Sequence, residues 1–139
     1  MPRLTRWYIK SALLYFIAAN TLGVLLVLPT GLRRLPAVHI LSPVYVHLLV
    51  VGWLTQLIFG VVWWMFPVWS RERPHGHEKL GWATYALLNT GLLIRAVAEP
   101  AVALGNTRIP AGALVLSALL QLLAAVAFVA NTWGRVRAR

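Results

Sequence analysis

The sequence predicts an all-α fold, a four-helix bundle that crosses the lipid bilayer. Of its 139 residues, 60% are hydrophobic and only 12% are charged, whereas a soluble domain averages about 25% charged. The hydrophobic residues gather in four runs, each close to or above the ~20 residues that span a bilayer as a helix. Helices are expected because strands with open edges would leave backbone groups unpaired in lipid. Residues 1–139 are therefore interpreted as one membrane domain.

The first predicted helix covers residues 8–28 and follows three basic residues, Arg3, Arg6 and Lys10. A basic start is also typical of signal peptides, but this apolar run is long and no convincing small-residue cleavage site follows it. A retained membrane helix is therefore expected. Pro29 and Gly31 mark its end, because neither residue continues a helix easily.

The other three predicted helices cover residues 44–69, 80–104 and 109–133. Proline suits the first turn of a helix and breaks its interior, while glycine is common just past the end. Such residues lie at the expected starts and breaks: Pro43, Pro74, Gly76, Pro100, Gly105 and Pro110. The four runs and their boundaries thus agree on one topology.

Basic residues indicate the orientation of the bundle. Nine Lys and Arg residues lie at the two termini and in the middle loop, against three on the other side, which are Arg33, Arg34 and Arg108. Because Lys and Arg favour the cytoplasmic side, both termini are predicted to be cytoplasmic, in a multi-pass protein of the inner (cytoplasmic) membrane. The net charge of +10 is spread over helix flanks, so the lipid bilayer is the expected partner and nucleic acid is not.

The chain contains no cysteine, which excludes disulfides, iron–sulfur clusters, thiolate-bound copper and covalent c-type haem. It also lacks a Ser-His-Asp set, a phosphate loop and a nucleotide fingerprint. Its three acidic residues are not placed beside one another for acid–base chemistry: Glu72, Glu78 and Glu99. The sequence therefore offers no self-contained catalytic site, and enzyme activity stays open.

His47 is the most informative residue because it lies inside the apolar run 44–69. An ionisable residue in the bilayer is costly and persists where a ligand, a partner or a proton path stabilises it. A neutral imidazole is a common ligand of metals and of haem iron. His47 is therefore interpreted either as an iron ligand or as a histidine that donates to a backbone carbonyl.

Arg95 is expected at the same depth as His47. It lies fifteen residues past Leu80, which is roughly 22 Å of helical rise toward the outer side. Glu99 is one turn later on the same face and can pair with Arg95. Three further residues of the first outer loop are expected just above, namely Arg33, Arg34 and His39. An imidazole beside guanidinium groups suits a haem with two propionates, and a structural ion pair is the alternative.

Other residues of the second and third helices allow two interpretations each. Gly52 and Gly60 either let a flat ring lie against the helix or let another helix approach. Trp53 either borders a macrocycle or packs in the core. Polar amides inside the membrane are expected to form interhelical hydrogen bonds, and these are Asn20, Gln56, Asn89 and Gln121. His75 and His77 are either solvated loop residues or metal ligands.

Residues 47–67 resemble helix two of haem–copper oxidase subunit I, especially that of C-type oxygen reductases, nitric oxide reductases and related short four-helix proteins. The shared pattern is a histidine, a Gly-Trp pair, a glycine, two aromatics and a proline, here His47, Gly52, Trp53, Gly60, Trp63, Trp64 and Pro67. In that family this histidine is an axial ligand of the low-spin haem b. The resemblance therefore implies haem b bound by His47.

The resemblance does not extend to the catalytic centre of those enzymes. Their subunits have many more helices, and histidines on later helices bind a second haem and copper. All four histidines of this chain lie between positions 39 and 77, so no copper and no self-contained reduction of oxygen or nitric oxide are expected.

A low-spin haem needs a second axial ligand. His75 and His77 are predicted to lie across the membrane, roughly 40 Å from His47 along a straight helix. His39 reaches the same iron only if its loop folds back over the second helix. His47 of a second copy is preferred, which predicts a two-fold homodimer that shares the haem.

The leading interpretation is a membrane-bound b-type cytochrome that transfers electrons to or from a respiratory-chain partner or a quinone. Two alternatives stay open. One is a haem-free structural or assembly subunit of a respiratory oxidase complex. The other is a five-coordinate haem protein that binds a gas and signals.

Overall fold

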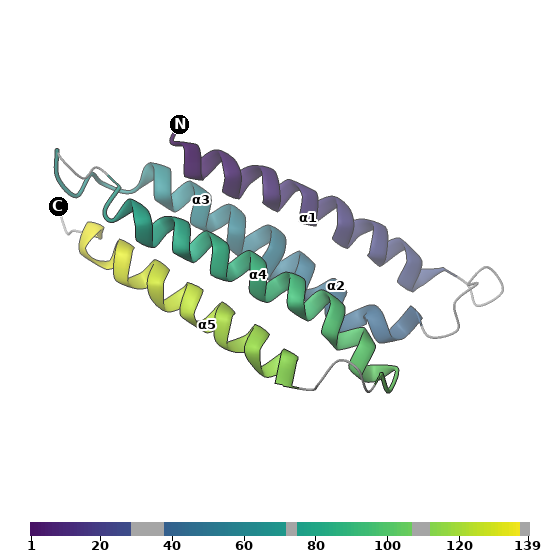
Figure 1. Ribbon diagram of the computed structural model, residues 1–139. Helices are drawn as coiled ribbons and strands as arrows, with labels where there is room; N and C mark the ends of the chain where they lie inside the picture. The colour runs from purple at the N-terminus through teal and green to yellow at the C-terminus, as the bar shows by residue number, and fades with distance from the viewer. Residues whose placement is uncertain (29–37, 72–74, 107–111, 137–139) are drawn as a thin grey trace.

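The computed structural model describes residues 1–28, 38–71, 75–106 and 112–136. Within these ranges it contains helices and no strand (Figure 1). Four helical runs are long and apolar enough to cross a membrane: Arg3–Val27, His39–Met65, Glu78–Ala103 and Gly112–Arg135. The predicted all-α, four-helix membrane fold is confirmed. The start of α1 (Arg3–Val27) and the 3₁₀ turn Trp133–Arg135 lie at one end of the bundle, here called the terminal end, and the opposite end is called the far end.

The second membrane helix, His39–Met65, is built from several pieces and is called the composite helix. A 3₁₀ turn, Val38–Leu41, leads into α2, Ser42–His47. A π-helical segment, Leu48–Thr55, follows and continues into α3, Gln56–Met65. Eight residues of π-helix are unusual because this form mostly occurs as single turns inside α-helices, frequently at functional sites.

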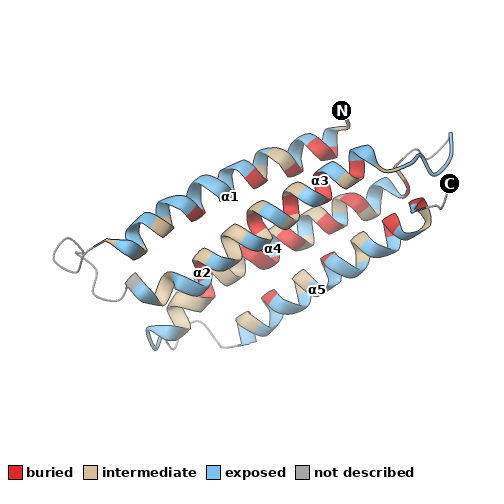
Figure 2. Cartoon of the chain, turned by 180° about the vertical axis from the view of Figure 1, so that it is seen from behind, coloured by how far each residue is buried: buried red, intermediate tan, exposed pale blue. Residues whose placement is uncertain are grey.

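The other membrane helices pack around the composite helix. The first, α1 (Arg3–Val27), packs along it, and α4 (Glu78–Ala103) contacts both of them. The last helix, α5 (Gly112–Thr132), packs mainly along α4. It also meets the composite helix through stacked Phe59 and Phe128 rings, whose centroids are 3.7 Å apart. Figure 2 shows buried residues concentrated on α3 and α4, while most of α1 and α5 faces outward.

Glycines allow the central helices to approach closely. A side chain added at Gly60 would meet the Tyr8 side chain of α1 at 2.8 Å. A side chain added at Gly81 of α4 would meet Trp63 of the composite helix and, at 2.8 Å, Leu4. Small residues are the usual means by which membrane helices approach, since lipid offers no hydrophobic drive for association. These glycines therefore set the packing of the terminal half of the bundle.

Two helix boundaries differ from the sequence prediction. The first helix begins at Arg3, five residues before the predicted start, because Leu4 and Thr5 are buried against neighbouring helices. The composite helix ends at Met65, four residues before the predicted end. Phe66 is extended, with φ −66° and ψ 150°, because the residue before a proline is disfavoured in the α region. The residues predicted to open the last helix, 109–111, lie outside the described residues.

The third membrane helix passes through Pro100 and ends at Ala103. Pro100 has no N–H to donate to the carbonyl of Ala96, yet the helix continues for three more residues. Gly105 has φ +73°, and its N–H donates to Val102 while Asn106 N–H donates to Ala101. These two bonds form a Schellman motif, in which glycine adopts the left-handed conformation at little cost. Gly105 rather than Pro100 therefore ends the helix.

Arg135 binds the end of the composite helix instead of facing water. Its side chain is 1% exposed. Its guanidinium donates to the carbonyl oxygens of Trp63 at 3.2 Å, Phe66 at 2.8 Å and Pro67 at 3.0 Å. The last carbonyls of a helix have no partner within the helix and carry partial negative charge. Arg135 thus joins the end of the chain to the C-terminus of α3.

Arg135→Gln is expected to destabilise the protein by about 2–3 kcal/mol, because buried carbonyl groups would lose a charged donor. Unfolding by sodium dodecyl sulfate in mixed micelles measures this change. Arg71→Gln is the control, since Arg71 is exposed at the same end. Equal stability of the two variants would show that the Arg135 contacts contribute nothing.

Candidate functional site

His47 lies at the last residue of α2, where the α-helix changes to the π-helical segment. Its Nδ1 atom is 2.9 Å from the carbonyl oxygen of Pro43. Because a carbonyl oxygen only accepts hydrogen bonds, Nδ1 carries a proton in this contact, as the second interpretation of His47 predicted, and in the neutral ring Nε2 keeps its lone pair. The ring is therefore held in the tautomer that can bind a metal through Nε2.

Arg95 and Glu99 of α4 lie beside His47. The Nη2 atom of Arg95 is 3.3 Å from Oε1 of Glu99, and Oε2 of Glu99 is 4.0 Å from Nδ1 of His47. The predicted convergence of these three residues at one depth is confirmed. They are called the far-end cluster, since they lie at the end of the bundle away from the termini.

The far-end cluster keeps hydrogen-bonding capacity that the chain does not use. The side chains of His47 and Glu99 are 27% and 16% exposed. The Nε donor of Arg95 and Oε2 of Glu99 are buried and have no hydrogen-bond partner among the described residues. Unsatisfied polar groups are costly in a low-dielectric environment. In the described part of the chain, the cluster therefore contains one unsatisfied cationic donor, at the buried Nε of Arg95, and an imidazole ring that is partly exposed.

The His47 side chain of this cluster lies on the side of the composite helix that faces away from α1. A side chain added at Gly23 of α1 would lie 3.0 Å from the ring of Tyr45, so Tyr45 faces α1. His47 is two residues later, about 200° further around an α-helix. His47 thus points away from α1 and toward α4, which carries Glu99.

Gly52 and Trp53 are occupied by packing within the chain. A side chain added at Gly52 would lie 2.8 Å from Tyr15 of α1 and 2.9 Å from Leu92 of α4. Trp53 lies against Phe16, with ring centroids 4.5 Å apart. In both cases the described contacts match the helix-packing interpretation rather than contact with a cofactor ring.

The remaining predicted site residues are not joined to the cluster. His39 is exposed in the 3₁₀ turn that continues directly into α2, so the fold-back that would bring it to the same iron does not occur. Arg33 and Arg34 lie outside the described residues. Their predicted role in binding a propionate stays a prediction.

The histidines at the terminal end have structural contacts. His75 stacks on Trp63, with ring centroids 6.0 Å apart and an angle of 12° between the planes. The backbone N–H of His77 donates to Oδ1 of Asn131 at 2.8 Å. Among the described residues no group of three potential metal ligands is found. The loop is therefore anchored by packing against α3 and α5.

Polar side chains join α1 to α4 along the bundle. Ser11 and Tyr85 share a hydrogen bond of 2.6 Å, and the Tyr15 hydroxyl donates to Oδ1 of Asn89 at 3.0 Å. The interhelical bond predicted for Asn89 is thus confirmed. Among the described residues, the other three predicted amides make no such bond. Asn20 and Gln121 donate within their own helices, and both polar atoms of Gln56 have no partner.

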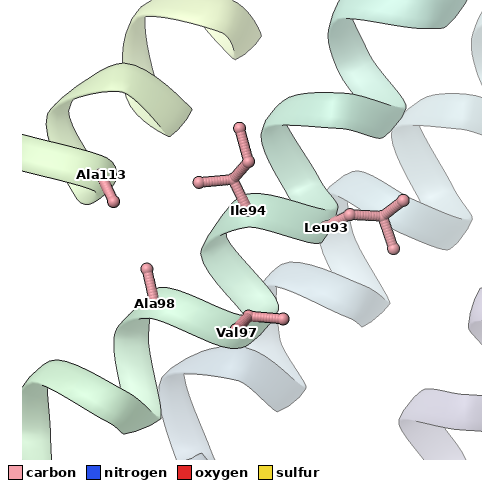
Figure 3. A pocket seen from close by; sticks show the side chains of 5 residues that line it. All are labelled: Leu93, Ile94, Val97, Ala98 and Ala113. Atoms are coloured by element: carbon pink, nitrogen blue, oxygen red, sulfur yellow. The ribbon is translucent and has the colours of Figure 1, made fainter. Parts of the chain in front are cut away.

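An apolar hollow of about 380 Å³ lies between α4 and α5 (Figure 3). Its described lining is entirely apolar, consisting of Leu93, Ile94, Val97, Ala98 and Ala113. Val97 is two residues from Arg95, about 200° around α4. The hollow therefore faces away from the far-end cluster and has no polar group to orient a ligand.

Comparison of the chain with family models, with curated proteins and with solved structures found no match.

Sequence reasoning missed the structural role of Arg135, which it counted only as a basic residue at the chain end. The available signal was position: Arg135 follows directly on the last apolar run, and arginine near a helix end can bind exposed carbonyls. The π-helical segment was also missed, since nothing in the apolar run of residues 48–55 distinguishes it from α-helix.

Burial, and secondarily the positive charge of Arg135, lowers the pKa of His75 below its ordinary value of 6.5. As pH falls below about 6.5, the unfolded chain therefore takes up a proton before the folded chain does. The contribution of His75 to the free energy of unfolding is complete above the ordinary pKa of histidine. It declines as the pH falls toward the pKa of His75 in the folded chain. We expect His75→Gln to reduce the loss of stability on acidification, measured by unfolding in mixed micelles between pH 7 and pH 5 (roughly the range in which histidine titrates). An unchanged pH dependence would contradict this assignment.

Gln56→Leu is expected to stabilise the protein by about 1 kcal/mol or more, because it removes a buried amide that has no partner among the described residues. Asn89→Leu is the matched control and should destabilise, since Asn89 accepts a hydrogen bond from Tyr15. Unfolding in mixed micelles measures both. A destabilised Gln56→Leu would mean that the amide makes a favourable interaction.

Proposed function

We propose that this chain is a membrane-bound b-type cytochrome that transfers electrons through a haem held by His47. The observation that carries the proposal is the tautomer of His47. The hydrogen bond from Nδ1 to Pro43 leaves Nε2 as the free nitrogen, and iron-binding histidines usually have their other ring nitrogen bound in this way. A bound haem would supply a one-electron redox centre.

The residues around His47 suit the polar edge of a haem. Arg95 lies at the same depth with its side chain 23% exposed, and guanidinium groups bind carboxylates such as propionates strongly. Its Nη2 atom contacts Glu99 at 3.3 Å, which fixes the position of the guanidinium. Arg95 would therefore bind a propionate while remaining paired with Glu99.

Glu99 also has a role toward the histidine. Its Oε2 atom lies 4.0 Å from Nδ1 of His47. A carboxylate near the proton of a ligating imidazole increases the electron donation of the other nitrogen. Glu99 would thus favour the oxidised iron and lower the reduction potential.

A second copy of the chain would supply the second axial ligand. His75 and His77 belong to the terminal end, and His39 does not fold back over the composite helix. The His47 side chain is 27% exposed, and a second chain would meet the composite helix on this exposed side. A two-fold dimer would place two His47 rings on opposite sides of one haem.

The proposal includes the inner (cytoplasmic) membrane and a redox partner, either a respiratory-chain protein or a quinone. Its support is the charge of the terminal end, which has all of the described Lys and Arg residues except Arg95: Arg3, Arg6, Lys10, Arg71, Lys79 and Arg135. By the positive-inside rule this end would be cytoplasmic. The haem would then lie near the outer face.

A haem-free structural or assembly subunit is the second candidate. It is favoured by Gly52 and Trp53, which contact Tyr15, Leu92 and Phe16 of the same chain. The part of the haem–copper oxidase pattern that surrounds the histidine is thus used for packing. In this candidate the far-end cluster is only a structural ion pair.

A reduced-minus-oxidised visible spectrum of the detergent-purified protein tests the proposal. We expect sharp low-spin bands that carbon monoxide does not change, because both axial positions would be filled. His47→Ala should abolish the bands, while His39→Ala, which removes an exposed histidine at the same end, should retain them.

Arg95→Gln should keep the low-spin bands but reduce haem retention during purification, since one propionate contact would be lost. A protein that stays colourless after haem is supplied during expression would exclude the cytochrome and leave the structural subunit. Bands that survive in His47→Ala would place the haem elsewhere.

A further inference from the structure

A basic cavity lies beside the first turns of α1 at the terminal end. Its volume is about 370 Å³, and among the described residues it is lined by Arg3, Arg6, Trp7 and Lys10. The three basic residues follow a helical spacing of three and four, which places them on one face of α1. This face is separate from the far-end cluster, and the inference does not depend on the proposed haem.

The positive charge of this cavity is not balanced within the described part of the chain. The two ion pairs found there both involve Glu99, at the far end. The first turn of α1 contains no acidic residue, and no side chain caps its N-terminus. The free N–H groups of that turn add partial positive charge to that of the three side chains. The cavity therefore favours an anion.

An apolar surface continues from the cavity along the same face of α1. Leu13, Leu14 and Ile17 are 51%, 68% and 64% exposed. They follow Lys10 at helical spacing and lead toward the middle of the bundle. A ligand that spans both parts needs an anionic head and an apolar tail, which a free phosphate ion lacks.

We propose that this cavity binds the phosphate of an anionic phospholipid, whose acyl chains lie along Leu13, Leu14 and Ile17. Arg3, Arg6 and Lys10 bind the phosphodiester as charged donors. Trp7, which is 55% exposed, lies at headgroup level, where tryptophan is common. The chain thus carries a specific lipid site at its terminal end.

Titration of the detergent-purified full chain with dioleoylphosphatidylglycerol, followed by native mass spectrometry, tests the site. We expect one saturable lipid per chain and much weaker binding of dioleoylphosphatidylcholine. Arg6→Gln/Lys10→Gln should weaken phosphatidylglycerol binding about 25-fold, since each cation near a membrane surface contributes about fivefold. Both side chains are exposed, and circular dichroism checks that the variant folds.

Arg71→Gln/Lys79→Gln is the matched control, because it removes two exposed basic residues from the same end. It should leave the affinity within about twofold of the unchanged chain, a change of well under 1 kcal/mol. An equal loss in both double variants would show general charge attraction and overturn the site. Equal binding of phosphatidylcholine would do the same. Displacement of the lipid by equimolar inorganic phosphate would mean that the cavity binds a free anion instead.

Discussion

The close contact of the composite helix with α1 and α4 is the interaction on which the other parts depend. At Gly52 the composite helix meets Tyr15 of α1 and Leu92 of α4 together. In lipid such contacts stabilise through van der Waals packing, because burial of apolar surface gives little drive there. A larger residue at this position would separate three helices at once.

This contact also fixes the register that forms the far-end cluster. His47 lies five residues before Gly52, and Glu99 lies seven residues after Leu92 on the antiparallel helix α4. Because the two helices are antiparallel, both side chains lie on the far-end side of this contact, and His47 Nδ1 lies 4.0 Å from Glu99. The packing of apolar residues thus determines which polar residues meet.

The terminal end is organised by different forces. Arg135 donates to carbonyls at the end of α3, and His75 stacks on Trp63. These contacts join the middle loop, the composite helix and the end of the chain. One end of the bundle is therefore closed by buried polar contacts, while the far end keeps the unused Arg95 Nε donor beside His47.

Much of this arrangement follows from the sequence. Run lengths gave the number of helices, and helical rise placed Arg95 and Glu99 at the depth of His47. The end of the composite helix was predicted four residues too late, although Pro67 indicates it, because a residue before proline avoids the α region. The sequence alone did not decide whether Gly52 lies against a flat ring or against another helix, because its neighbours come from helices distant in sequence. The burial of Arg135 was not predictable either, because it depends on where the last helix ends relative to α3.

Haem titration of the purified apoprotein tests the central claim, that His47 is the ligand around which two chains share a haem. Haem binding would be followed by the low-spin absorption bands, and the mass of the complex by native mass spectrometry. We expect saturation at half a haem per chain and a dimer that carries one haem. Saturation at one haem per chain, or no saturable binding to His47-containing protein, would contradict the central claim.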